Sequence, residues 1–365
     1  MLLSLLAMLG STSTQSVEPF PVAIDSFAQK QLQDVVNQQS GTGGLPAVYA
    51  AASVNGRIVA VACAGRKTID GEVKALVTDK LMIGSISKGV TATVIAALVS
   101  QGKLRWTQTV REALPDFSAK FGDHPALEAT FVDLISHKSG LPNGDAHMHL
   151  AKPPPAWRRS YAESMFSKPM AARFRSQEGH YSAGSTVAAH MAERLLESSF
   201  EDISKKYLFS PMKMETFGWG KPWELDKTQP MPTKTFNGKL VHPGADWNVY
   251  IKNDPSGGMH CSIADLCRYA TIHAEGESRN LPGISTSTIQ AMHRTFGLTP
   301  GSGGGATGLG EYSQIYVDPQ RRFAVVCVAL LEPSEGGQAK VEAVLNQVKK
   351  LHYGQSGLIA ADVVR

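Results

Sequence analysis

The chain of 365 residues lacks several patterns that mark particular classes of protein. Its net charge of +4 comes from 36 basic and 32 acidic residues without a dense basic run, so nucleic acid is not an expected partner. The zinc-protease motif H-E-x-x-H does not occur. The cysteines show no C-x-x-C spacing, which argues against zinc and redox motifs, and we interpret them as buried small hydrophobes. They are Cys63, Cys261, Cys267 and Cys327.

The apolar opening of the chain, residues 1–9, is too short to cross a bilayer. It resembles the apolar part of a signal peptide, although the usual basic start is missing. We predict a signal or N-terminal arm over residues 1–20, no integral membrane span, and a periplasmic or secreted protein, with a cytoplasmic location as the alternative. Residues 21–365, in a chain with 42% hydrophobic residues, are enough for one domain with a substantial core.

Strand-like segments appear near the beginning of the chain. An amphipathic helix is predicted over residues 25–38, and two apolar runs, 46–54 and 57–65, are predicted to be strands. They are separated by Asn55 and Gly56, a pair that strongly favours a tight hairpin turn.

Strand-like segments return near the end, at residues 311–317 and 322–331, before a closing helix over residues 337–351. Strands early, strands late and helices between them imply one sheet built from both ends of the chain. We expect a single domain in which residues 21–86 and 255–365 form the sheet part. Residues 87–254 are then an inserted, largely helical subdomain, and a cleft between the two parts is the natural place for a site.

Residues 84–88, Gly-Ser-Ile-Ser-Lys, begin a helix predicted over residues 87–102 and are the most informative feature of the chain. Positions i and i+3 share a helix face, so the amine of Lys88 can reach the hydroxyl of Ser85 and remove its proton. The helix N-terminus also favours negative charge at this place. S-x-x-K recurs from Ser100 and from Ser210, but only Ser85 has both a preceding glycine and a following helix.

This order of elements resembles the serine β-lactamase and penicillin-binding-protein superfamily, most closely its class C β-lactamase and family VIII-like esterase branch. The resemblance covers about residues 40–335. It implies a β-lactamase/transpeptidase-like α/β (α+β) fold, with an antiparallel sheet flanked by helices and an inserted, mostly helical subdomain. Besides residues 84–88, the similar segments are residues 45–48, 55–56, 78–84, 102–104, 134–142, 256–258 and 264–266.

The second motif of this branch, Tyr-x-Asn, has an incomplete counterpart. Tyr181 stands at the tyrosine position, and Ala183 stands where the branch has asparagine. The resemblance implies that Tyr181 relays protons between Ser85, Lys88 and the leaving group, and that Ala183 lies at a substrate-binding position. The alternative is that Tyr181 is an ordinary core or interface residue.

The third motif, Lys-Thr-Gly or His-x-Gly, is expected within residues 301–310, where the basic residue is absent. The resemblance implies that Thr307, within Ala306-Thr307-Gly308 or Gly305-Ala306-Thr307, lies at a substrate-binding position there. The resemblance implies an oxyanion hole formed by the backbone N–H of Ser85 and that of Gly308 or Leu309. The same stretch contains G-x-G-x-x-G, but a strand follows it where a dinucleotide site needs a helix, so no cofactor is expected.

The resemblance implies a serine hydrolase that forms an acyl-enzyme on Ser85 with a small-molecule ester or amide. Neutral Lys88 would accept the proton, which requires a largely sheltered amine. Because the motif asparagine and the basic residue are both missing, we favour an esterase-like enzyme acting on small or medium esters. The alternatives are a β-lactamase or D-amino-acid peptidase, and a catalytically impaired relative that binds a ligand or partner.

Two further patterns have competing interpretations. Asp145, His147 and His149 alternate near His137, which suggests a metal site or an ordinary polar loop, and we predict no metal. Residues 152–175 are cationic with interleaved aromatic side chains. They either line a cleft for an anionic or aromatic substrate or form a solvated helical face.

Overall fold

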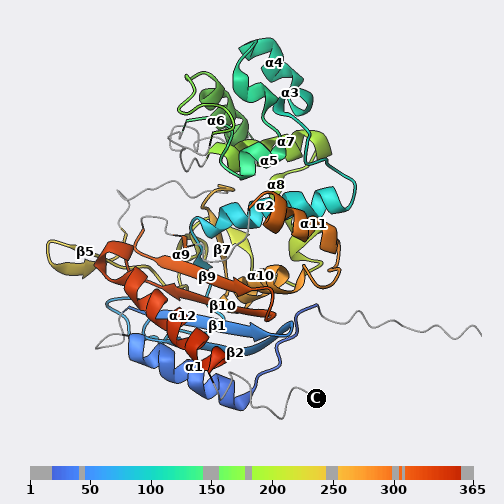
Figure 1. Ribbon diagram of the computed structural model, residues 1–365. Helices are drawn as coiled ribbons and strands as arrows, with labels where there is room; N and C mark the ends of the chain where they lie inside the picture. The colour runs from blue at the N-terminus through green and yellow to red at the C-terminus, as the bar shows by residue number, and fades with distance from the viewer. Residues whose placement is uncertain are drawn as a thin grey trace, which may run out of the picture.

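A five-stranded antiparallel sheet, built from both ends of the chain as predicted, forms the centre of the fold (Figure 1). Its strands lie in the order β2-β1-β10-β9-β8. They are β1 (Val48–Val54), β2 (Arg57–Ala64), β8 (Gly304–Gly305), β9 (Tyr312–Asp318) and β10 (Phe323–Ala329). The computed structural model describes residues 19–40, 46–142, 156–176, 183–243, 254–297, 304–305 and 309–354.

The predicted hairpin joins β1 to β2. Asn55 and Gly56 have φ angles of 51° and 75°, the left-handed pair that a two-residue turn between twisted strands requires. The register shifts between Ala52 and Ser53, where the strand pair contains an irregularity. The hairpin prediction is therefore confirmed, including the turn.

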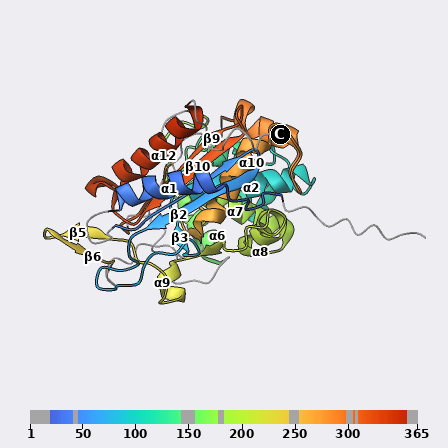
Figure 2. The same ribbon diagram turned by 90° about the horizontal axis from the view of Figure 1, so that it is seen from below.

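Two helices cover one face of the sheet, α1 (Ser26–Gln39) and α12 (Gly337–Tyr353), and they lie side by side (Figure 2). The carboxylate of Asp25 accepts a hydrogen bond of 2.8 Å from the Ala28 N–H and so caps the start of α1. Buried side chains such as Leu32 and Val348 fill the space between these helices and the strands. Both helices were predicted at these places.

The opposite face is covered by α10 (Ile263–Glu275), which packs on β1 and β10. Next to it runs α2 (Ile86–Ser100), whose side chains from Val90 to Leu98 are all buried. A helix that is apolar on every side belongs in the interior, and α2 is central because it lies between the sheet and the upper lobe (Figure 1). Cys261, Cys267 and Cys327 are buried as expected, and Cys63 is half-buried.

The upper lobe in Figure 1 consists of short helices from the middle of the chain. None of the helices in the described ranges has both the length and the apolar composition needed to cross a bilayer. The lobe contains α3 (Val110–Ala113), α4 (Pro115–Phe121), α5 (Phe131–Ile135), α6 (Ala156–Phe166) and α7 (Ala183–Leu196). The remaining helical segments are η2 (Pro125–Glu128), α8 (Phe200–Ser204), η4 (Lys205–Phe209), α9 (Pro222–Leu225), α11 (Thr286–Gln290), η5 (Ala291–Thr295) and η6 (Pro333–Glu335).

The middle of the chain also contains short strands that the sequence pattern did not indicate. The strands β5 (Lys234–Phe236) and β6 (Lys239–Val241) form a separate hairpin. A small antiparallel sheet has the order β3-β7-β4, with β3 (Leu81–Met82), β7 (Met259–Cys261) and β4 (Gly218–Trp219). Strands of two or three residues show no alternating pattern in a sequence. This small sheet brings the segment before Ser85 next to residues about 180 positions later, because Leu81 pairs with Cys261 and Met82 pairs with His260.

We expect acid to destabilise the protein through His260 of β7. This buried imidazole hydrogen-bonds the Gly220 carbonyl at 2.7 Å, and burial lowers the pKa of His260 to about 4. Since the unfolded chain binds this proton more readily, the free energy of unfolding should fall by about 3 kcal/mol between pH 6.5 and pH 4. Urea denaturation across this pH range should show that loss of unfolding free energy in the wild type. The loss should be smaller in His260→Asn, whose side-chain amide can still donate a hydrogen bond to the Gly220 carbonyl. Parallel pH dependences in the two proteins would contradict the assignment.

Candidate active site

Ser85 lies at the turn between β3 and α2. Gly84 precedes it with a φ angle of 51°, a left-handed conformation that glycine adopts without strain. Ser85 occupies the N-cap position of α2, yet its side chain makes no capping hydrogen bond. Its backbone N–H donates to none of the described residues. The hydroxyl and the N–H are therefore both available for chemistry at the start of a helix.

Lys88 reaches back one turn of α2 toward Ser85. Its Nζ lies 2.8 Å from Ser85 Oγ and 3.0 Å from the carbonyl oxygen of Ser256. Burial lowers the pKa of Lys88 below its usual value, and the negative charge of Asp254 partly opposes this shift. The amine is thus sheltered, as deprotonation of a serine hydroxyl requires.

A turn over residues 254–258 completes the surroundings of the amine, and the sequence analysis did not recognise its first residue. The Asp254 carboxylate accepts hydrogen bonds from the N–H and hydroxyl of Ser256, at 2.9 and 2.7 Å. Thr91 of α2 donates a hydrogen bond of 2.7 Å to the Pro255 carbonyl. Aspartate often accepts a hydrogen bond from the backbone two residues later and so closes an Asx-turn. The sequence Asp254-Pro255-Ser256 was therefore the pattern from which this turn could have been predicted.

The second-motif position lies at the start of α7, of which Ala183 is the first residue. Its side chain is buried and offers no amide to a substrate. Gly184 follows, where a Cβ atom would lie 2.0 Å from the Leu134 carbonyl oxygen, so glycine allows α7 to pack closely on α5. Tyr181 lies outside the described residues.

The third-motif residues Thr307 and Gly308 also lie outside the described residues. Leu309 is fully buried and packs in a small cluster with Met82 and Trp223. Ser313 of β9 donates a hydrogen bond of 2.8 Å to the Ile83 carbonyl, which connects the central sheet to the segment just before Ser85.

The predicted alternation of Asp145, His147 and His149 falls outside the described residues. His137 is described and lies just after α5 with a φ angle of 62°. Within the described part of the chain, no group of three or more histidine, cysteine, aspartate or glutamate side chains is arranged to hold a metal ion.

The described part of the cationic stretch, residues 156–175, does not form one surface. Arg159 lies on the exposed side of α6 and forms ion pairs with Asp116 and Glu163, at 2.6 and 3.0 Å, which matches the predicted solvated face. The interleaved aromatic side chains instead belong to the core and line no substrate cleft. They are Trp157, Tyr161 and Phe166.

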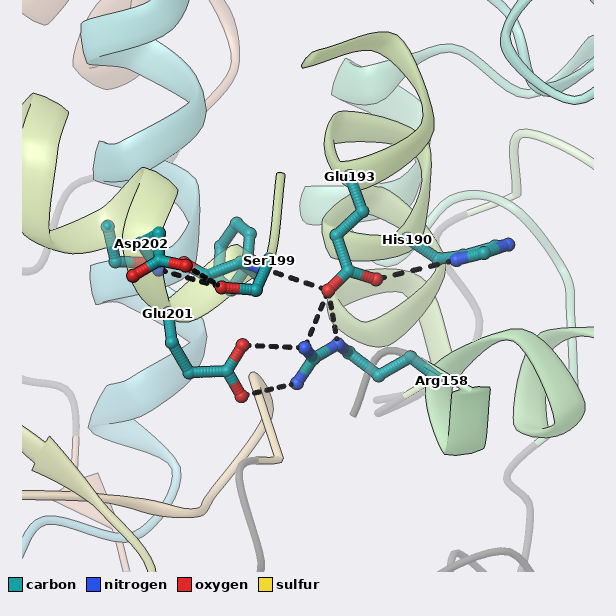
Figure 3. A network of polar contacts seen from close by, with 8 residues as sticks. Arg158, His190, Glu193, Ser199, Glu201 and Asp202 are labelled. Carbon is teal, nitrogen blue, oxygen red and sulfur yellow. Dashed lines mark hydrogen bonds and ion pairs between the residues drawn. The ribbon is translucent and has the colours of Figure 1, made fainter. Parts of the chain in front are cut away.

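Arg158 lies in a buried polar network that joins three helices (Figure 3). Its guanidinium contacts the carboxylate of Glu193 on α7 and, at 2.7 and 3.0 Å, that of Glu201 on α8. Glu193 also accepts a hydrogen bond from the Phe200 N–H at 3.0 Å and lies 3.5 Å from His190. A fully buried side chain with these contacts neither lines a cleft nor belongs to a solvated face, so Arg158 fits neither of the two interpretations.

Comparisons with known proteins agree with this arrangement. A sequence profile of the Beta-lactamase family matches residues 32–348. Penicillin-binding protein 4 of Amycolatopsis lactamdurans is 24% identical over 212 residues, 55% of this chain and 52% of that protein, so the chain spans about half the length of this relative. The structure of D-amino acid amidase from Ochrobactrum anthropi SV3 with D-phenylalanine matches with a TM-score of 0.67 at 15% identity, covering 89% of this chain and 99% of that chain. The structure of class C beta lactamase from Rhodobacter sphaeroides matches with a TM-score of 0.64 at 15% identity, covering 88% of this chain and 99% of that chain. The structural matches establish a shared fold.

Proposed function

Because the chain belongs to the Beta-lactamase family, we propose that it is a serine hydrolase that forms an acyl-enzyme on Ser85. The observation that carries the proposal is the 2.8 Å contact between Lys88 Nζ and Ser85 Oγ, made by an amine whose pKa is lowered by burial. A lysine in this state is a general base for a neighbouring hydroxyl. The contact lies at the start of α2, where developing negative charge is stabilised.

The proposed reaction proceeds in two halves. Neutral Lys88 accepts the Ser85 proton while Oγ attacks the substrate carbonyl carbon, and the carbonyl oxygen takes up the displaced electron pair. The backbone N–H groups of Ser85 and of Gly308 or Leu309 are assigned to that oxyanion. Its collapse breaks the bond to the leaving alcohol, which receives the proton from Lys88, with Tyr181 assigned to the relay. Water then attacks the acyl group by the same route and restores Ser85.

For the substrate, we propose small or medium carboxylic esters. Ala183 provides no amide at the place where β-lactam-hydrolysing relatives have asparagine, and residues 301–310 contain no basic residue to attract a substrate carboxylate. A site with side chains that bind a polar substrate group strongly prefers substrates that carry this group. A site without those side chains gains no binding energy from the group. Esters need neither contact.

The test combines a covalent probe with paired substrates. A fluorophosphonate probe should label the wild type and fail to label Ser85→Ala. A short-chain p-nitrophenyl ester should be hydrolysed with a higher kcat/KM than a chromogenic cephalosporin or a D-amino acid amide. The D-amino acid amide is included because the chain shares its fold with a D-amino acid amidase.

Each proposed alternative has its own outcome. Faster turnover of the cephalosporin or of the D-amino acid amide would replace the esterase assignment by that activity. A folded protein that neither labels nor turns over any of the three substrates would favour a non-catalytic, ligand-binding relative.

A further inference from the structure

We propose that Asp254 is a positioning residue for the Ser85–Lys88 pair, because it fixes the carbonyl group that orients the amine and places a negative charge beside it. The inference rests on the proposed hydrolase function for its kinetic consequence. The positioning of the Lys88 amine by the turn over residues 254–258 does not depend on that function.

Asp254 fixes the turn through both its side chain and its backbone. The carboxylate accepts hydrogen bonds from the Ser256 N–H and hydroxyl at 2.9 and 2.7 Å, and from the Thr186 hydroxyl of α7 at 3.3 Å. Its carbonyl oxygen accepts hydrogen bonds from the N–H groups of Gly257 and Gly258, at 3.2 and 2.8 Å. The side chain therefore connects α7 to the turn and leaves the Ser256 carbonyl pointing at Lys88.

The Ser256 carbonyl determines how the lysine nitrogen can face the serine. A neutral amine carries two N–H groups and one lone pair. The contact of 3.0 Å to the Ser256 oxygen uses one N–H group and fixes the nitrogen 2.8 Å from Ser85 Oγ, where the lone pair of the neutral amine can face the hydroxyl. A carbonyl that moved would release the amine from this orientation, and small misplacements of a catalytic group lower rates strongly.

The charge of Asp254 acts on the same nitrogen. Burial favours neutral Lys88, and the Asp254 carboxylate is the charged group among the described residues that opposes it. Tyr269 of α10 lies close to Gly89, since a Cβ atom there would be 2.6 Å from its hydroxyl, and His273 lies 3.1 Å from the Thr93 hydroxyl. Burial raises the pKa of Tyr269 and lowers that of His273, so both remain neutral near pH 7. Asp254 therefore shifts the balance between amine and ammonium toward the ammonium form, against the larger effect of burial.

Two replacements of Asp254 separate its charge from its geometry. Asp254→Asn retains an oxygen for the Ser256 N–H and removes the charge, so the acidic limb of kcat/KM against pH should move down by about one pH unit. Asp254→Ala also loses the turn contacts, so kcat should fall by about 10-fold at every pH in addition to that shift. As a matched control, Asp34→Asn removes an exposed charge from the outer side of α1 and should leave the profile unchanged.

A second measurement does not depend on turnover. With lysine labelled with carbon-13 at Cε, the Lys88 resonance, identified by its loss in Lys88→Met, should titrate at a lower pH in Asp254→Asn than in the wild type. If this shift occurs in a protein without hydrolase activity, the proposed function fails and the inference stands. An unchanged Lys88 titration in Asp254→Asn would overturn the inference, whether or not the enzyme turns over esters.

Discussion

Replacing Lys88 by methionine is expected to lower kcat for an ester substrate by about 10⁴-fold or more, a loss similar to that in Ser85→Ala. Methionine is close to lysine in length and has no group that accepts the Ser85 proton. Because hydroxyl and amine act as one unit, the double variant should be little worse than either single variant. Steady-state kinetics of the two single variants and the double variant measure this.

The stability of Lys88→Met separates a catalytic role from a structural one. A lysine whose pKa is lowered by burial gains little from its charge, so methionine should leave the free energy of unfolding unchanged or higher. Lys103→Met is the matched control, because Lys103 lies exposed after the end of α2 in a second S-x-x-K sequence. Full ester hydrolysis by Lys88→Met would remove the lysine from the mechanism.

Local patterns predicted the parts of the fold that depend on neighbouring residues. Asn55 and Gly56 indicated the hairpin because few residue pairs adopt two successive left-handed conformations. The contact between Ser85 and Lys88 followed from helix geometry, since Ser85, the N-cap residue of α2, lies three positions before Lys88 on the same side of the helix. Such features are determined within a few positions of the chain, and a single sequence contains the information needed.

Contacts between distant segments could not be predicted in this way. Asp254 and Thr186 approach each other only because α7 packs beside the turn before β7, and neither has a sequence pattern that names its partner. The charge pattern around Arg158 suggested that its side chain lies at the protein surface, because arginine is usually exposed. The two glutamates that pair with its buried guanidinium lie 35 and 43 positions away in the sequence. Whether a charged side chain can be buried depends on which opposite charges the fold brings next to it, and a single sequence does not show this.

Arg158→Ala is expected to lower the free energy of unfolding by about 3–5 kcal/mol. The guanidinium is fully buried between Glu193 and Glu201, and its removal leaves the Glu193 carboxylate buried without its cation (Figure 3). Burial by itself raises the pKa of Glu193. The His190 hydrogen bond and the Arg158 charge outweigh this effect, so the carboxylate is ionised in the native protein. Urea denaturation at pH 7, followed by circular dichroism, measures the loss.

Two companion variants test whether the uncompensated charge is the cause. Arg159→Ala, one residue along α6, breaks ion pairs that are about 40% exposed on the arginine side and should cost less than about 1 kcal/mol. Arg158→Met combined with Glu193→Gln removes the cation and the buried anion together, and it should recover much of the lost stability because burying apolar groups needs no counter-ion. A double variant as unstable as Arg158→Ala would show that the loss comes from helix packing and hydrogen bonds, such as the one from the Phe200 N–H, and not from the stranded charge.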